Sequence, residues 1–152
     1  MTKDFKDHAA ACRFLNEIGI ISQLSGNAFE RALPDDMTLP QFSVLNHFQR
    51  LGGEWTPLRL SRAFQVTKGA MTNTLAHLER KGFVAVRPNE KDGRSKQVSL
   101  TETGSAAHRR ALQAAAPLLD ELLGEFPAGE LAAALPLLEH MRAWLDEKRN
   151  AN

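Results

Sequence analysis

Two short helical patterns and two β-like runs follow one another in the middle of this 152-residue sequence. Apolar residues recur at helical spacing over residues 58–64 and again over residues 67–82, with only two residues between the segments. The runs FVAVRP and KQVSLT come next. Between them lies NEKDGRS, whose Asn, Asp and Gly content is typical of a hairpin turn. The predicted order is therefore helix, turn, helix, strand, hairpin tip and strand.

This order is the layout of a winged helix-turn-helix, so we expect a mainly α fold with a small β wing. The helix at residues 67–81 is predicted to lie in the major groove of duplex DNA, and the wing at residues 88–96 at the minor groove. Met71, Leu75 and Leu78 share one helix face and are expected to pack on the preceding helix. The remaining surface is small, polar or cationic, which suits contact with base edges. Its candidate DNA-binding residues are Gly69, Thr72, Asn73 and His77.

Charge is unevenly distributed along the chain. Residues 57–96 carry nine Lys or Arg and three Asp or Glu, a net charge of +6. Residues 1–56 carry −2 (five against seven), and residues 97–152 carry −3 (five against eight). A basic centre between acidic ends indicates a surface for a polyanion, and chance clustering on a solvated surface is the alternative. The candidate contacts to the phosphate backbone are Arg59, Arg62, Lys68 and Lys96.

Arg94 is the candidate that the wing tip offers to the minor groove. Narrow minor grooves concentrate negative potential, and a guanidinium on a projecting hairpin fits there. Asp92 lies two residues earlier and is expected to orient Arg94 through a charge-assisted hydrogen bond. The alternative is an ordinary solvated, charged turn.

Long amphipathic helices are predicted on both sides of the winged unit. Residues 7–33 show helical spacing, and Thr38 with Gln41 forms a capping-box pattern at the start of a second helix. After the wing, Thr101 is expected to cap a long helix, and a last helix is expected over residues 130–148.

These terminal helices carry more apolar surface than a compact winged unit can cover. Apolar faces left over in this way are usually buried against another subunit, so we expect a symmetric homodimer. Packing within one chain is the alternative. The predicted organisation is a helical dimerisation region at residues 1–36 and 105–152, around a winged helix-turn-helix DNA-binding domain at residues 37–104.

Residues 58–104 resemble the signature stretch of MarR-type regulators, a bacterial family of transcriptional regulators. The shared features are a recognition helix ending in Leu-Glu-x-x-Gly, an Asp-x-Arg-Ser wing and a closing Leu-Thr-x-x-Gly. The resemblance implies a homodimeric regulator, most often a repressor, on a pseudo-palindromic operator with two recognition helices and two wings. The sequence departs from the pattern at Asn73, where many relatives carry arginine, and this difference bears on base preference.

The resemblance also implies a small, frequently phenolic effector in a cleft between the dimer helices and the winged domain. The first, second and fifth helices would line it, with His47, Phe48 and Trp55 as candidates; plain packing is the alternative. One branch of the family senses hydroperoxides through a cysteine of its first helix, where tyrosines hydrogen-bond the sulfur. This chain has no tyrosine. We therefore expect Cys12 to be buried and inert at the dimer interface, with a thiol redox switch as the alternative.

Motifs for catalysis and metal binding do not stand out. The sequence shows no phosphate-binding glycine loop or nucleophile elbow, and its five histidines are scattered without metal-ligand spacing. No apolar run approaches the ~20 residues of a membrane span, and the N-terminus shows no signal-type apolar core. We expect a cytoplasmic protein with no enzymatic activity, cofactor or metal. A winged-helix protein-interaction module without DNA binding is the alternative from another functional class.

Overall fold

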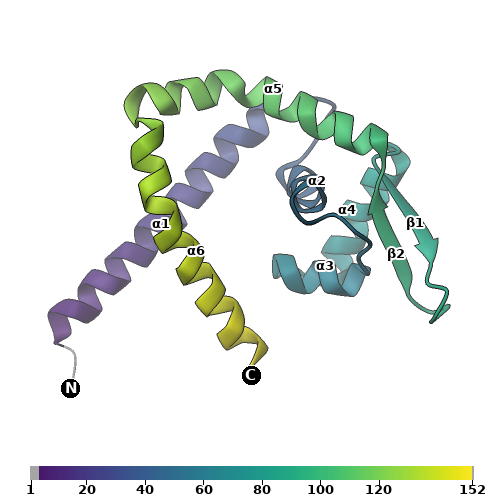
Figure 1. The fold of residues 1–152 in the computed structure, drawn as a ribbon, viewed down its shortest axis with the longest axis horizontal. Coiled ribbons are helices and arrows are strands. Elements are labelled where there is room, and N and C mark those ends of the chain that lie inside the picture. The colour runs from purple at the N-terminus through teal and green to yellow at the C-terminus, as the bar shows by residue number, and fades with distance from the viewer. Residues whose placement is uncertain (1–3, 152) are drawn as a thin grey trace. The chain divides into compact units, whose positions relative to one another are not determined.

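The computed structural model describes residues 4–151 and divides into two compact units, Met1–Ala115 and Ala116–Asn152. The first unit holds four complete helices, the β-hairpin and the first part of α5, and the second holds the rest of α5 and α6 (Figure 1). This order confirms the prediction of a mainly α fold with a small β wing. The elements are α1 (Phe5–Ala32), α2 (Leu39–Leu51), α3 (Pro57–Phe64), α4 (Lys68–Arg80), β1 (Val84–Pro88), β2 (Lys96–Leu100), α5 (Glu102–Glu125) and α6 (Ala128–Asn150).

Threonine hydroxyls begin four of the helices of the first unit. In each case the side-chain oxygen accepts a hydrogen bond from the backbone N–H three residues later, at 3.0–3.4 Å, which satisfies one of the free donors at a helix start. The capping residues of α2, α3, α4 and α5 are Thr38, Thr56, Thr67 and Thr101. The capping box predicted for α2 is only half formed, because the Gln41 side chain accepts a hydrogen bond from Lys81 instead.

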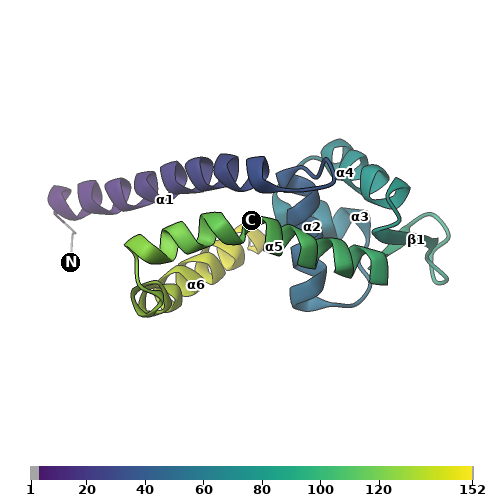
Figure 2. The same ribbon diagram turned by 90° about the horizontal axis from the view of Figure 1, so that it is seen from above.

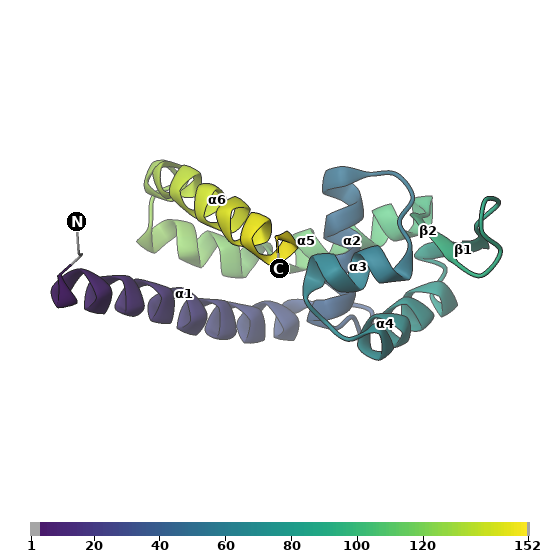
Figure 3. The same ribbon diagram turned by 90° about the horizontal axis from the view of Figure 1, so that it is seen from below.

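The core of the first unit joins α2, α3, α4 and the hairpin. Leu45, Leu60, Leu78 and Val98 are fully buried there, one from each of these elements. The predicted inner face of α4 is confirmed, since its three apolar residues are buried. Helices α3 and α4 lie next to one another, as Figure 3 shows, and complete the helix-turn-helix.

The wing is a two-stranded antiparallel hairpin that extends past α4 (Figure 2). Its register pairs Val84 with Leu100 at the base and Pro88 with Lys96 near the tip. Trp55 adds a short antiparallel bridge to β2: its N–H donates to the Val98 carbonyl at 2.9 Å and its carbonyl accepts from the Val98 N–H at 2.8 Å. The segment between α2 and α3 therefore holds the hairpin against the helices.

The second unit is made of helix without a buried residue among those described. α5 continues through Pro117 and α6 through Pro136. The two helices are separated at Phe126 and Pro127, and α6 includes the last helix predicted at residues 130–148. Large apolar side chains are exposed along both helices in a single chain, including Leu122, Leu135 and Trp144. The assignment of residues 1–36 and 105–152 to dimerisation stays a prediction, and α1 belongs to the same compact unit as the winged region.

The start of α5 lies against the chain segment that leaves α4. The Thr101 hydroxyl donates to the Gly82 carbonyl at 2.6 Å, and the Thr101 N–H donates to the Phe83 carbonyl at 3.2 Å. Gly104 follows one turn later, and a methyl group on its Cα would overlap the Phe83 carbonyl oxygen. The closing Leu-Thr-x-x-Gly sequence thus has a structural reason: a hydroxyl and a missing side chain allow this close approach.

Substituting Gly104 with alanine is expected to destabilise the protein by about 1–3 kcal/mol, the usual cost of forcing extra volume into a packed site. Denaturant unfolding followed by circular dichroism measures the change. The matched control is Gly69→Ala on exposed α4, where an added Cβ meets nothing within 4 Å. This variant is expected to gain up to about 1 kcal/mol from helix propensity. Equal stability of Gly104→Ala and the wild type would contradict the close approach.

Candidate nucleic-acid interface

Three segments that are far apart in the sequence meet in one groove of the first unit. The start of α3, the start of α4 and the returning arm of the hairpin line a groove of about 550 Å³, here called the cationic groove. It brings together three exposed cations, Lys68, Arg94 and Lys96, and the hydroxyl-bearing Thr72 of α4. The residues that line it are Thr56, Pro57, Leu58, Lys68, Thr72, Arg94, Ser95 and Lys96. Four of the predicted DNA-binding residues therefore share one site.

The outward surface of α4 is divided between two flanks. Thr72 faces the cationic groove, whereas Asn73 and His77 line a separate cavity of about 650 Å³ beside the start of α2. Successive residues of a helix are about 100° apart, so neighbours such as Thr72 and Asn73 point to different sides. Gly69 is exposed between them in the first turn, with nothing within 4 Å of a Cβ placed there.

His77 is held in one tautomer by Arg80. The two side chains lie one helical turn apart, and Arg80 Nη2 is 2.7 Å from His77 Nδ1. A guanidinium can only donate hydrogen bonds, so Nδ1 is the acceptor and the ring proton is on Nε2. His77 consequently offers a hydrogen-bond donor to any group that approaches this flank of α4.

Asp92 shapes the wing tip through the backbone. Its carboxylate accepts a hydrogen bond from the Arg94 backbone N–H at 3.1 Å, and its carbonyl accepts from the Ser95 N–H at 3.1 Å. The hydrogen bond expected from Asp92 therefore reaches the main chain of Arg94 and not the guanidinium. Asn89 forms a second local turn, its Oδ1 accepting from the Lys91 N–H at 3.1 Å. These two side chains build a compact tip that carries the exposed Arg94.

Other basic side chains of the winged region lie outside the cationic groove. The Arg59 guanidinium stacks over the Trp55 ring, 4.2 Å from its centroid, and Arg62 is exposed near the end of α3. Arg87 forms an ion pair with Glu54 on another face of the hairpin. Sequence reasoning did not foresee that Arg59 packs on Trp55, because the contact depends on where the α2–α3 connection places that ring.

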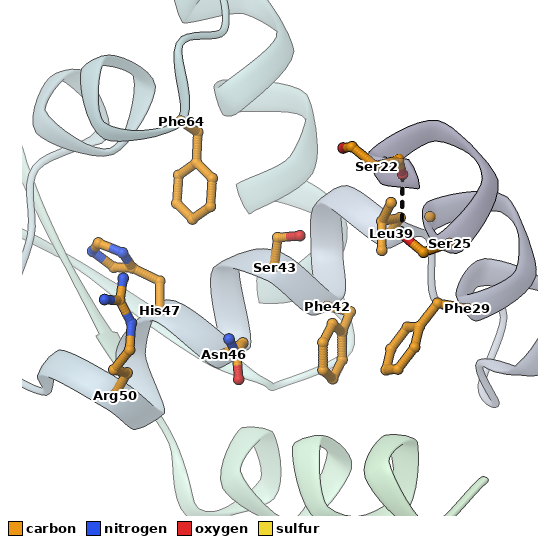
Figure 4. A pocket seen from close by; sticks show the side chains of 11 residues that line it. Ser22, Ser25, Phe29, Leu39, Phe42, Ser43, Asn46, His47, Arg50 and Phe64 are labelled. Carbon is orange, nitrogen blue, oxygen red and sulfur yellow. Dashed lines mark hydrogen bonds between the residues drawn. The ribbon is translucent and has the colours of Figure 1, made fainter. Parts of the chain in front are cut away.

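A second cavity of the first unit has aromatic walls. It measures about 450 Å³ and lies between α1, α2 and Phe64 of α3 (Figure 4). We call it the aromatic cavity; Phe29, Phe42, His47, Arg50 and Phe64 are among the side chains that line it. Of the three candidates for an effector site, His47 lines this cavity, Phe48 is buried in the core, and Trp55 lies outside the lining. The first and second helices line the cavity as predicted. The remaining lining residue, Phe64, comes from α3 and not, as had been expected, from the fifth helix.

His47 is the most unusual side chain of the aromatic cavity. It is 94% buried, from a relative exposure of 6%, and its Nε2 is a buried nitrogen without a hydrogen-bond partner. The ring packs against Trp55 and Phe64, with centroids 4.4 and 5.2 Å away. A polar atom buried without a partner costs free energy that a hydrogen-bonding ligand recovers.

Two histidines of the first unit resist protonation. Burial lowers the pKa of His47 below its ordinary value of 6.5, and the guanidinium groups of Arg50 and Arg59 lower it further. Burial, followed by the charge of Arg109, also lowers the pKa of His108. His108 stacks on Phe42 at 5.3 Å, and its Nε2 lies 3.0 Å from Asn46 Oδ1, so it links α5 to α2.

The cysteine of the described chain lies in α1, outside the lining of the cationic groove and of the aromatic cavity. Cys12 is exposed on α1 of the single chain, so its burial in a dimer interface and the alternative of a thiol switch both stay predictions. Within residues 4–151, no group of three His, Cys, Asp or Glu side chains is arranged to hold a metal ion. None of the helices in that range has the length and apolar character of a membrane span.

Known proteins resemble the chain in sequence. A family model described as the MarR family matches residues 35–95. The multiple antibiotic resistance protein MarR of Salmonella typhimurium is 36% identical over 110 residues, covering 70% of this chain and 74% of that protein. An uncharacterized HTH-type transcriptional regulator of Bacillus cereus is 35% identical over 100 residues, or 66% of this chain. The chain spans only 61% of the length of that Bacillus protein.

Solved structures resemble it as well. Wild-type MarR from E. coli in its apo form matches with a TM-score of 0.71 and 32% identity, covering 83% of this chain and 93% of that chain. A mutant of the same protein complexed with operator DNA matches with a TM-score of 0.69 and 30% identity, covering 91% and 99%.

Acidification is expected to destabilise the protein as the pH falls below about 6.5. Because the folded-state pKa of His47 and of His108 is lowered, the unfolded chain binds more protons than the folded chain in this range. Their contribution to stability is complete above pH 6.5 and is lost as the pH falls towards the folded-state pKa. Thermal unfolding at a series of pH values measures it.

The control for this pH dependence is a set of histidine variants. Combining His47→Gln with His108→Gln is expected to flatten the dependence, whereas His8→Gln, at an exposed position of α1, leaves it as in the wild type. A double variant with the full wild-type pH dependence would show that other groups cause it.

Proposed function

The chain belongs to the MarR family of helix-turn-helix transcriptional regulators, and from this premise we propose that it binds duplex DNA as a homodimer and represses transcription. The observation that carries the proposal is the cationic groove. A DNA strand that passes from a major groove to the next minor groove presents its phosphates between a recognition helix and a wing. Lys68, Arg94 and Lys96 line this path from both sides.

The reading surfaces follow from the same geometry. With α4 in the major groove, Thr72 on one flank and Asn73 and His77 on the other face base edges, and the small Gly69 permits close approach. The asparagine amide matches the paired donor and acceptor of adenine. The His77 Nε2–H matches an acceptor such as purine N7 or a phosphate oxygen. Arg94 at the wing tip is suited to the minor groove.

A second copy of this chain is the proposed partner of the terminal helices. In a single chain Phe5 is 81% exposed, Leu24 66% and Trp144 50%, and these side chains lie on α1 and α6. Apolar surface of this extent is normally covered in solution. A two-fold dimer presents two winged regions to DNA, which predicts a pseudo-palindromic operator with half-sites about one helical turn apart.

Selection of random duplex DNA on the purified protein tests the proposal. Sequencing of the bound pool is expected to yield a palindrome, and a titration of that site at several salt concentrations is expected to show the steep salt dependence of phosphate contacts. Binding without any enriched sequence would contradict specific reading. If the protein bound no DNA and instead bound another protein through an exposed surface, the protein-interaction alternative would be favoured.

Substituting Arg94 with alanine is expected to weaken operator binding by about 1–3 kcal/mol, the range for a specific arginine contact. Fluorescence anisotropy at fixed salt measures it. Arg87→Ala is the matched control in the same hairpin, because Arg87 pairs with Glu54 away from the cationic groove. The exposed Arg87–Glu54 ion pair contributes about 0–1 kcal/mol to folding stability, so the variant should stay folded. Its operator affinity should change little, because Arg87 lies outside the cationic groove. An Arg94→Ala protein with wild-type affinity would remove the wing from the interface.

We further propose a small aromatic effector that bears a hydroxyl group, as the family resemblance implies, in the aromatic cavity. Phenylalanine rings from three helices suit an aromatic ligand, and the unpartnered His47 Nε2 suits its hydroxyl. Arg50 also lines the cavity and favours a ligand with a carboxylate. Hydroxybenzoates combine these features and serve as probes.

His47→Leu is expected to weaken hydroxybenzoate binding by about 0.5–1.5 kcal/mol, the worth of one hydrogen bond, or up to about tenfold in Kd. Isothermal titration calorimetry measures it. Ser43→Ala changes another lining residue of the same cavity without touching the imidazole and is the control. Equal affinity of wild type and His47→Leu would place the ligand elsewhere.

A further inference from the structure

We propose that Lys81 is a positioning residue that sets the orientation of α4 relative to α1 and so restricts the half-site spacing that the dimer accepts. The inference rests on the proposed function, DNA reading by a homodimer. It assigns a role to a lysine outside the cationic groove.

Lys81 immediately follows α4 and joins it to the connection between α1 and α2. Its Nζ donates to the Asp35 carbonyl at 3.0 Å, to the Asp36 carbonyl at 3.3 Å and to Gln41 Oε1 at 2.9 Å. An ammonium group has three donors, and here each has an acceptor. Gln41 is buried in the first turn of α2. The Lys81 side chain therefore connects the end of α4, the proposed reading helix, to the start of α2 and to the residues before it.

The α1–α2 connection that receives Lys81 has an uncommon backbone. Asp35 and Asp36 both lie in the left-handed region, with φ of 63° and 52°. Two successive residues of this kind, neither of them glycine, persist only where the surroundings hold them. Met37 and Thr38 separate the left-handed pair from α2, and Lys81 binds both carbonyl groups of the pair.

Two further elements hold the same connection. Arg110 of α5 pairs with the Asp35 carboxylate, with Nη2 at 3.1 Å from Oδ2. Glu30 of α1 accepts a hydrogen bond from the Leu39 N–H at 3.0 Å, across the connection. The Asp35–Asp36 segment is therefore a joint where α1, α2, α4 and α5 are fastened by polar contacts, and Lys81 is the contact from the reading helix.

A small rotation at this joint produces a large displacement at the start of α4, which is proposed to contact DNA. The 13 residues of α4 span about 20 Å at 1.5 Å per residue. A tilt of a few degrees at Lys81 therefore moves the start of α4 by about 1 Å relative to α1. In a dimer the displacement occurs in both copies and changes the distance between the two reading helices. Loss of the Lys81 contacts is thus expected to relax the spacing preference.

Lys81→Met tests the proposal, because methionine keeps most of the aliphatic length and removes the donors. The full chain is titrated against the selected operator and against versions with one base pair inserted or deleted between the half-sites. For the wild type we expect a loss of about tenfold or more at the altered spacings, since each base pair shifts and rotates one half-site. For Lys81→Met we expect the three affinities to agree within about threefold, and affinity for random DNA to stay within about twofold.

A merely structural role would leave the spacing preference unchanged. Lys81→Arg retains donors and is expected to keep the wild-type preference, whereas Lys68→Met in the cationic groove is expected to lower affinity at all spacings alike. If Lys81→Met does not fold, Gln41→Leu, which removes one acceptor, should show a smaller loss of preference. Folded Lys81→Met with the wild-type spacing preference would overturn the inference.

Failure of the proposed function has a different signature. A wild-type protein that enriches no operator contradicts DNA reading itself. In that case hydrogen exchange in the free protein still tests the joint. The Met37 N–H, which donates to the Pro34 carbonyl at 3.0 Å, should exchange faster in Lys81→Met than in the wild type. Unchanged exchange at Met37 would overturn the role of Lys81.

Discussion

The close approach of α5 to the chain that leaves α4 is the constraint on which the winged region depends. Thr101 is hydrogen-bonded to the Gly82 and Phe83 carbonyls, and Gly104 gives the space for the Phe83 carbonyl. The hairpin therefore begins and ends at the same point, beside the last turn of α4. The Trp55 bridge to Val98 fastens β2 to the α2–α3 connection. With both attachments in place, Arg94 and Lys96 stand opposite Lys68, and the cationic groove has a defined width.

Acidic and basic side chains of the first unit are distributed unevenly around the cationic groove. Acidic side chains pair with cations elsewhere: Glu54 with Arg87 on the hairpin, and Asp35 with Arg110 on α5. The described residues that line the groove include three cations and no acid. Asp92 at the wing tip was expected to pair with Arg94, but its carboxylate accepts a hydrogen bond from the Arg94 backbone N–H instead. Positive potential is thus concentrated where a phosphate backbone is proposed to lie, which favours fast and salt-sensitive association.

Local patterns predicted most of the elements, and contacts between distant segments explain what they missed. The inner face of α4, the caps Thr38 and Thr101 and the hairpin tip depend on residues within a few positions of one another, so spacing was sufficient. Gln41 was expected to complete a local capping box, but its partner is Lys81, 40 residues later. Phe48 was expected at an effector site, and packing among α2, α3 and the hairpin buries it in the core. The two flanks of α4 have different surroundings, because the hairpin lies beside one flank and the start of α2 beside the other.

Helix α2 connects the proposed effector cavity to the proposed reading helix. His47 and Arg50 in its second half line the aromatic cavity, and Gln41 in its first turn is bound to Lys81. Four large apolar side chains of α2 are buried between these points, so the helix is held as a rigid rod in a packed core. A ligand that moved α1 away from α2 would displace this helix, and the Gln41–Lys81 hydrogen bond would pass the displacement to the end of α4. An effector in this cavity would therefore change the spacing of the two reading helices without touching the DNA surface, provided that it binds the two arrangements with different affinity.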